Sequence, residues 1–437
     1  MFPNPQSALP LPLRPSLERY RKIAKELVRA CKSGQPESLR VWAEQWVQTL
    51  VRLSRIDVTP QLPVHIREWA DDVESFVRRQ MLVGECICAL ADAQFVLARS
   101  HGFESWPKFV RHLESLAADN SSASRFEAAA DAIVTGDTAT LKRLLSEEPE
   151  LVRARSTREH GATLLHYVSA NGVEGYRQKT PPNIVEIAEI LLRAGAEVDA
   201  TADVYGGECT ALGLAATSVH PERAGVQEAL LRKLLDYGAA FDPLSIAGNG
   251  QSIVIACLAN GRPRAAAYLA SRGAQCGLVE IAALGPLDRL KDFFEGKDDP
   301  QFVPVSSELD VAFLYACQFG HRDVVAYLIQ QGANIAARDR NGQTGLHHAV
   351  MGCNPQTVHL MSKYTELLEV VNVYGGKPAG QALWCAAHDA DPDRYIPILD
   401  SLFAAGAKFP ARHAAISPHI DAWLKERGSV VEPDWSW

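Results

Sequence analysis

The sequence predicts an all-α protein in which a small helical domain precedes a long solenoid of stacked helix pairs. Three observations support this fold class. The 437 residues are 47% hydrophobic and 22% charged, as in ordinary globular proteins, which excludes disorder over most of the length. Up to about residue 118, apolar side chains recur at helical spacing between short connections. From about 125 to 410, one set of motifs returns every 26 to 47 residues.

The charge and composition exclude several classes of partner. The net charge of −8 disfavours a general electrostatic attraction to nucleic acid. The longest uncharged stretch, 243–261, is broken by polar residues and glycines, so we expect no membrane span and no membrane partner. The nine cysteines are scattered without a CxxC motif, which favours reduced thiols in a cytoplasmic protein. Because the known metal and nucleotide motifs are missing, we expect no cofactor and no metal.

The first part of the chain divides into a leader and a helical domain. Residues 1–13 hold four prolines and no charge, and we expect a flexible leader. Ser16 is placed to cap a first helix that ends before Gly34. Four more helices are predicted from the spacing of their apolar residues, at about 36–50, 65–81, 85–100 and 106–116. The domain is therefore predicted to span 14–118, and a polar stretch marks its end.

The repeat is clearest near residue 320. Phe313-Leu-Tyr-Ala-Cys-Gln-Phe-Gly-His321 is followed by an apolar helix and by Gly332-Ala333, and the next unit opens with Asn341-Gly-Gln-Thr-Gly-Leu-His-His-Ala349. These segments resemble the ankyrin repeat, in which an inner helix, a turn, an outer helix and an extended hairpin follow one another. The glycine has a physical reason, because helices commonly end at a residue with positive φ.

The same pattern can be followed through about eight repeats over 125–410. A small buried residue of each inner helix serves as a marker, at Ala132, Val168, Ala215, Ala256, Ala282, Ala316, Ala349 and Ala386. The fifth repeat has room only for a degenerate pair of helices, because the spacing before it is 26 residues. Residues 411–437 are expected to form a C-terminal helical cap and a tail with two tryptophans. The stretch 92–107 resembles the helical leader ahead of ankyrin repeats in some bacterial proteins, which indicates a bacterial source.

The resemblance implies a non-catalytic scaffold that binds a partner protein through its concave face and hairpins. It also implies that His166 and His347 are structural, each bonded to the threonine three residues earlier. A specific site must therefore be sought where the chain departs from the repeat.

The departures concentrate in repeats two and three. Residues 173–183 and 218–225 are extra residues in the same connection of adjacent repeats, so we expect them to lie side by side. They supply Tyr176, Arg177, Lys179 and His220. Long loops on a rigid scaffold are frequent sites of function, but both insertions can equally be solvated surface loops.

The hairpins that lead into the same two repeats are also unusual. Arg155, Arg158 and His160 precede repeat two, and Tyr205-Gly-Gly-Glu208 precedes repeat three. Arginines can clamp a carboxylate or a phosphate, and paired glycines let a ligand approach the backbone. The alternative is an ordinary tight turn with solvated arginines.

Two functions therefore remain open. The first is the protein-binding scaffold. The second is a site in repeats two and three that binds a small anionic or polar ligand, or an acid–base enzyme that uses His160, Tyr176, Lys179 or His220. A pocket closed by 173–183 against 155–160 and 203–208 would favour the second function. An open face there would favour the first function. If the protein kept its full function after a short turn replaced 174–182, the concave face around Tyr315, His348 and Trp384 would be the next candidate.

Overall fold

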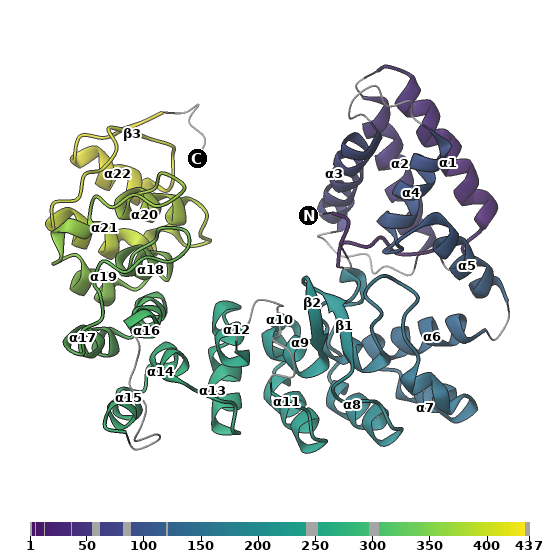
Figure 1. Cartoon of the computed structure of the whole chain (residues 1–437). Helices are drawn as coiled ribbons and strands as arrows, with labels where there is room; N and C mark the ends of the chain where they lie inside the picture. The colour runs from purple at the N-terminus through teal and green to yellow at the C-terminus, as the bar shows by residue number, and fades with distance from the viewer. Residues whose placement is uncertain are drawn as a thin grey trace. The chain divides into compact units, whose positions relative to one another are not determined.

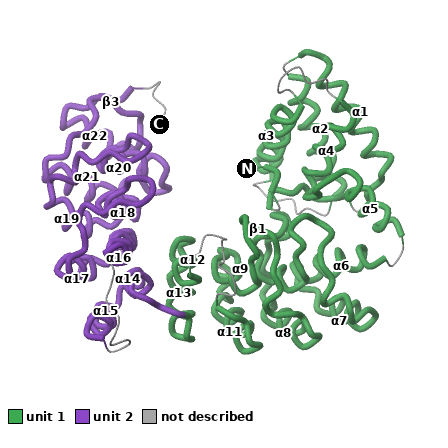
Figure 2. Tube along the Cα trace, viewed as in Figure 1, with its two compact units in different colours: residues 1–274 green, residues 275–437 purple. Residues whose placement is uncertain are grey.

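The chain folds into two compact units, residues 1–274 and 275–437 (Figure 2). The division falls inside the predicted repeat array, and each unit is described by itself. The computed structural model describes residues 2–4, 6–12, 14–35, 37–54, 62–81, 89–118, 121–241, 252–296 and 306–432.

Five helices open unit 1, as the apolar spacing predicts (Figure 1). They are α1 (Leu17–Lys32), α2 (Ser38–Leu53), α3 (Leu62–Met81), α4 (Leu90–Ser100) and α5 (Trp106–Ala117). The predicted cap is confirmed, because the Ser16 side chain accepts a hydrogen bond from Arg19 N. Trp42 and Trp46 of α2 are buried in one apolar core that draws on all five helices.

The proline-rich leader is packed rather than free, which differs from the expectation of a flexible segment. Phe2 and Leu9 are buried in the core of the helical domain. The Leu9 amide donates to the Ser100 carbonyl at 2.7 Å, and the Phe2 ring meets Phe76 edge-on at 5.7 Å. The leader has no charge and enough apolar side chains to cover this core, so packing outweighs its lack of regular structure.

One disulfide also departs from the sequence prediction. Cys31 on α1 is disulfide-bonded, so the expectation of reduced thiols throughout is wrong at this position. Six further cysteines among the described residues are free.

Pairs of helices continue unit 1 after the helical domain. The pairs are α6 (Ser122–Thr135) with α7 (Thr138–Glu147), the 3-10 helix η2 (Leu164–Ser169) with α8 (Ile184–Arg193), α9 (Ala211–Thr217) with α11 (Gln227–Asp236), and α12 (Ile253–Ala259) with α13 (Pro263–Ser271). Short elements lie between them, namely η1 (Pro149–Arg153), η3 (Gly175–Arg177) and α10 (Val219–Arg223). Strands β1 (Thr201–Val204) and β2 (Gly207–Thr210) pair in antiparallel register as the hairpin before repeat three.

Unit 2 begins with the predicted degenerate repeat. Its two helices, α14 (Leu278–Leu284) and α15 (Leu287–Phe294), are short, and residues 278–296 contain no strand. Regular pairs follow: α16 (Ser306–Phe319) with α17 (Arg322–Gln330), α18 (Gly345–Met351) with α19 (Pro355–Met361), and α20 (Pro378–Ala387) with α21 (Ile396–Ala404). The 3-10 helices are η4 (Thr365–Leu367) and η5 (Pro392–Tyr395).

The end of the described chain is a single helix held by a short parallel bridge. Helix α22 (Pro418–Glu426) lies between β3 (Arg412–His413) and β4 (Val430–Val431). The two tryptophans predicted to mark the tail, Trp435 and Trp437, lie outside the described residues.

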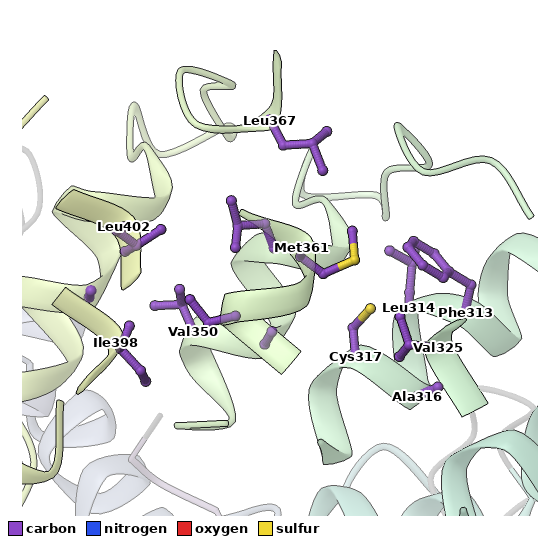
Figure 3. Close-up of a cluster of buried hydrophobic side chains, with 14 of the residues drawn as sticks. Phe313, Leu314, Ala316, Cys317, Val325, Val350, Met361, Leu367, Ile398 and Leu402 are labelled. Atoms are coloured by element: carbon purple, nitrogen blue, oxygen red, sulfur yellow. The ribbon is translucent and has the colours of Figure 1, made fainter. Parts of the chain in front are cut away.

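One apolar cluster runs through the helix pairs of unit 2. Figure 3 shows part of it, with Phe313 and Val325 on one side of Met361 and with Ile398 and Leu402 on the other. Each helix pair is too small to bury its own apolar side chains, so stacking on the neighbouring pair supplies the core.

The threonine–histidine pairs have the structural role that the resemblance implies. Thr163 N donates to His166 Nδ1 at 3.1 Å, and His166 Nε2 lies 3.2 Å from the Cys209 carbonyl of the next repeat. His347 makes the equivalent contacts to Thr344 and Gly376. Both histidines therefore fasten one repeat to the next.

Candidate functional site

The insertion of repeat two carries a buried ion-pair cluster, formed by Glu127, Arg158, His160, Glu174 and Arg177. The Glu174 side chain is fully buried. Its Oε1 lies 2.9 Å from Arg158 Nη1, 3.5 Å from His160 Nε2 and 3.6 Å from Arg177 Nη1. The Glu174 carboxylate thus joins the insertion to the segment before η2.

Glu127 on α6 is the second anion of the cluster. Its Oε1 lies 2.5 Å from Arg158 Nη1, and its Oε2 lies 2.8 Å from Arg177 Nη1. Arg177 also reaches Asp131 at 2.7 Å, one helical turn further along α6. Each guanidinium group is therefore compensated by two carboxylates or more.

The electrostatics favour the charged form of both glutamates. Burial alone would raise the pKa of Glu127, but the two guanidinium groups outweigh this effect and hold that pKa at about 2. Burial likewise opposes ionisation of Glu174, yet Arg158, the His160 hydrogen bond and Arg177 hold its pKa well below the usual value. These carboxylates stay ionised at neutral pH, which rules out a proton donor role for them there.

Two tyrosines pack against the arginines of the cluster, and neither of them is ionised at neutral pH. The Tyr176 hydroxyl lies 3.4 Å from Arg158 Nη2, and the Arg177 guanidinium lies over the rings of Tyr167 and Tyr176. Burial raises the pKa of both phenols. His160 is buried as well, with Nδ1 accepting from Ala162 N at 3.0 Å. The geometry therefore holds charge inside the fold and presents no acid–base pair to solvent.

The same region joins the N-terminal helical domain to the repeats. The Glu159 amide donates to the Gly102 carbonyl at 2.9 Å, and its carboxylate lies 2.5 Å from Arg99 Nη1 of α4. The Thr157 hydroxyl lies 2.8 Å from His112 Nδ1 of α5. Burial lowers the pKa of His112 to about 4, so this imidazole is neutral near pH 7.

The structure brings only some of the predicted site residues together. Arg158, His160, Tyr176 and Arg177 meet in the ion-pair cluster. Arg155 instead donates to the carbonyls of Gly161 and Thr201 at 2.9 and 2.6 Å, and so joins two hairpins. The others lie apart from the cluster: Lys179 and Glu208 are exposed, Tyr205 is at the β1–β2 turn, and His220 is half-buried in α10.

Two cluster members were not predicted as site residues, namely Glu127 and Glu174. Glu174 was visible as one charged residue of the insertion. Glu127 and Asp131 are four residues apart, so the two carboxylates share one face of an alanine-rich helix. That pair was the available signal, but the arginine partners of Glu127 lie 31 and 50 residues further along the chain.

A cavity of about 370 Å³ lies beside this region, but the insertion does not close it. Its lining residues come from the leader, α4, the segment before η2, the turn after η2, and the β1–β2 hairpin: Pro3, Asn4, Gln6, Arg99, Glu159, Gly172, Asp203, Val204, Tyr205 and Gly206. Residues 173–183 contribute none of them. The pocket that would favour a ligand site built by the insertion is therefore not formed.

A second surface stands out in unit 2, where large apolar side chains are exposed on the inner helices. Met351 of α18 is 40% exposed and Trp384 of α20 is 50% exposed. These residues are 33 apart, and Gln318 of α16 precedes Met351 by the same interval. Because helices α16, α18 and α20 pack side by side in this order, equivalent positions form one row.

Further aromatic residues lie on α16, on α20 and on the hairpin before α20, and the two on α16 are half-buried. The Tyr315 and Phe319 rings of α16 stack at 6.1 Å, and the Trp384 ring stacks on His388 at 4.4 Å. In the hairpin before α20, Val373 and Tyr374 are 63% and 76% exposed. We call the set Tyr315, Phe319, Met351, Tyr374 and Trp384 the aromatic face.

The position at which α20 begins shows that the repeat register predicted for the eighth repeat was wrong. Lys377 is the N-cap of this helix, as Thr344 is of α18. The buried residue that corresponds to Ala349 is therefore Ala382, 33 residues later, rather than Ala386. The repeat is more regular here than the sequence alone indicated.

Stacked helix pairs joined by hairpins define a helical-repeat protein. Within it, residues 313–361 match the family model described as ankyrin repeats (many copies), so the chain carries ankyrin repeats. Repeats of this kind are in general scaffolds for protein interactions. The structure is also similar to the crystal structure of the human ASB11 ankyrin repeat domain, with 19% sequence identity and a TM-score of 0.36. That similarity covers 64% of this chain and 99% of the other. No curated protein matches the chain.

None of the described helices combines the length and the apolar character that crossing a bilayer requires.

Proposed function

We propose that this protein is a non-catalytic scaffold that binds a partner protein through the aromatic face of unit 2. One observation carries the proposal: large apolar side chains are exposed at equivalent positions of successive repeats and on the adjoining hairpin. Burying a large apolar side chain contributes about 1.5–3 kcal/mol. Contiguous exposed apolar patches on folded proteins commonly mark interaction sites.

The composition of the face supports a protein ligand. Tryptophan, tyrosine and methionine are enriched in the buried centres of protein interfaces, and they carry most of the energy of binding where they fill pockets of the partner. Charged side chains also lie on the hairpin before α18, where Arg338 and Arg340 are exposed. Apolar anchors within a polar rim are the usual anatomy of a protein–protein interface.

The repeats on either side provide the rigid frame for this face. The amide of Val373 donates to the Asn341 carbonyl at 2.9 Å, which ties one hairpin to the next. We infer that the array continues from about 125 to 410 and that its inner-helix side is the binding side, as the resemblance implies.

The test compares partner capture by the full chain and by two variants. Trp384→Ala combined with Tyr374→Ala removes two anchors of the aromatic face. Tyr237→Ala removes an exposed aromatic residue at the end of α11 in unit 1, and so serves as the control. A specific partner should bind the wild type and the control alike, and bind the double variant at least about tenfold more weakly.

Two results would count against the proposal. One is a partner whose affinity for the double variant equals its affinity for the control. The other is a partner whose binding is lost only when unit 1 is altered, because its contact surface would then lie outside the aromatic face.

A further inference from the structure

We propose that the cavity between the leader and the β1–β2 hairpin of unit 1 binds a small organic cation with an ammonium or guanidinium group. This inference goes beyond the scaffold function and depends on a different unit. It rests on three features of the cavity: its charge, the aromatic residue at its edge, and the way its wall is held in place.

The charge of the lining favours a cation. Arg99 is already paired with Glu159 at 2.5 Å, so its guanidinium is compensated. Asp203 is exposed, and among the described residues its carboxylate has no ion pair and no hydrogen bond, whereas its amide is fixed by the His160 carbonyl at 2.8 Å. The lining therefore includes one residue with an uncompensated carboxylate, and an ammonium or guanidinium group is the natural partner of such a group.

Tyr205 supplies an aromatic surface in a conformation that tyrosine rarely adopts. Its φ is 57° and that of Gly206 is 78°, as in a tight hairpin turn that usually contains Asn-Gly. Such backbone conformations of bulky residues persist where the surroundings hold them, and they cluster at functional sites. The Tyr205 hydroxyl contacts the side chains of Gln6 and Asn171. The ring is half exposed and lines the cavity, where its π face can attract a cation.

The leader forms one side of the cavity and is fixed there by a backbone hydrogen bond. The Gly175 amide donates to the Gln6 carbonyl at 2.7 Å. A Cβ atom at position 175 would lie 2.6 Å from that carbonyl oxygen, so glycine is required for this close approach. Asn4 and Gln6 then add amide groups to the lining. A volume of about 370 Å³ lies within the range of small-molecule sites and suits a ligand of amino-acid or polyamine size.

The arginines that the sequence suggested for binding an anion are not available to do so. Arg158 and Arg177 are paired inside the ion-pair cluster, and Arg155 bonds two backbone carbonyls. An anion in the cavity would meet two carboxylates and one guanidinium that is already occupied. The same geometry that disfavours an anion favours a cation.

The experiment is calorimetric titration of the full chain with agmatine, which carries both a guanidinium and an ammonium group, at physiological ionic strength. Glutarate, a dianion of similar length, is titrated in parallel. We expect saturable one-to-one binding of agmatine and none of glutarate. Asp203→Asn should weaken agmatine binding about tenfold or more, and Asp323→Asn, an exposed carboxylate of unit 2, should leave it unchanged.

A second variant tests the aromatic edge. Tyr205→Asn suits the turn, removes the ring and should also weaken binding. The proposal is overturned if agmatine shows no saturable binding, if glutarate binds instead, or if Asp203→Asn and Asp323→Asn have the same affinity, since the last result would mean attraction to the acidic chain as a whole. Trp384→Ala should not change agmatine binding, so failure here is separate from failure of the scaffold proposal.

Discussion

Repeat two of unit 1 and repeat eight of unit 2 use their polar and apolar side chains in opposite ways. The irregular repeat two has charge turned inward, with Glu174 and Arg158 buried in the ion-pair cluster. The regular repeat eight has aromatic rings turned outward, with Trp384 and Tyr374 at least half exposed. The comparison teaches that irregularity in a repeat array can serve the fold, whereas a regular repeat can carry the surface that meets a partner.

The two regions differ because charged side chains in the insertion of repeat two are covered by other parts of unit 1, whereas large apolar side chains on the inner helices of unit 2 are exposed. The insertion of repeat two contacts the leader through Gly175, and two of its charged side chains, Glu174 and Arg177, are removed from water. Buried charges must be paired, so the insertion supplies both Glu174 and Arg177. On the inner helices of unit 2, Met351 and Trp384 are 40% and 50% exposed among the described residues, so we expect substitution of these side chains to have little effect on the fold.

The largest expected effect comes from breaking the ion-pair cluster. Glu174→Ala removes one of the two buried carboxylates that compensate Arg158 and Arg177. Removing one partner of a buried ion pair costs about 3–5 kcal/mol of unfolding free energy. Urea unfolding measures it, with Arg193→Ala as the control, because the Arg193–Glu189 pair on α8 is solvent-exposed and should contribute no measurable stability. Equal midpoints for the two variants would show that the cluster is not a stabilising element.

The same comparison changes the expected result of shortening the insertion. From the sequence alone, we expect a short Gly-Ser turn in place of 174–182 to leave the melting temperature nearly unchanged, whether the insertion forms a site or a solvated loop. The structure contradicts that expectation, because the replacement deletes Glu174 and Arg177 together. We expect unit 1 to unfold at a clearly lower temperature. An unchanged melting curve would restore the surface-loop interpretation.

The next effect concerns buried leucines, one in each unit. Leu191 on α8 is fully buried, and Leu191→Ala should cost about 2–5 kcal/mol through lost transfer energy and a cavity. Leu328→Ala on α17 makes the equivalent change in unit 2, where the side chain is also fully buried. Leu90→Ala is the control, since Leu90 is 41% exposed. Similar losses for the two buried leucines would show that the units differ in their charge and not in their packing.

Acidification should weaken the helical domain through its buried histidines. Burial lowers the pKa of His101 to about 3 and that of His112 to about 4. Both folded values lie below the ordinary value of about 6.5, so their stabilisation is complete above pH 6.5 and is lost as the pH falls toward the folded values. Between pH 6.5 and 4.5 each loss is of the order of 1–3 kcal/mol.

Melting temperature against pH measures this loss in the wild type and in His112→Gln. The variant should have the flatter profile, because it has one fewer imidazole to protonate on unfolding. His419→Gln, an exposed histidine of unit 2, should follow the wild type. Glu127, with a pKa of about 2, adds a further loss only below pH 4.5. A His112→Gln profile parallel to that of the wild type would contradict the assignment.

The sequence predicted the parts of the fold that depend on local pattern. Ser16 caps α1, the α2 stripe with Trp42 and Trp46 is buried, and the motif that includes Thr344 and His347 sets the register of α18. These features follow from helical periodicity and from residues close together in the chain, so a single sequence contains them.

The contacts of the candidate sites required the tertiary structure. Glu127 meets Arg158 across 31 residues, and the leader meets Tyr205 across about 200. No repeating pattern in the sequence indicates that residues at these separations are in contact. The inner helix of repeat two is a 3-10 helix that ends at Ala170 with φ of 46°, which its apolar sequence does not reveal. Tertiary packing decides these features, since backbone propensity is a weak preference.

The smallest expected effect on stability is the one that bears most on function. Trp384 is half exposed and contacts chiefly His388, so Trp384→Ala should change the unfolding free energy by about 0.5 kcal/mol or less. Trp423 of α22 is the matched control, because it is buried and donates to Asp400 at 2.7 Å, and its replacement by alanine should cost about 3–5 kcal/mol. Urea unfolding of the two variants separates a tryptophan that the fold needs from one that it does not. If Trp384→Ala proved as costly as Trp423→Ala, the aromatic face would be part of the core, and its exposure would give no argument for a partner. If it is nearly neutral, the fold gives no reason to keep a large apolar ring in water, and the reason must be sought in what the ring binds.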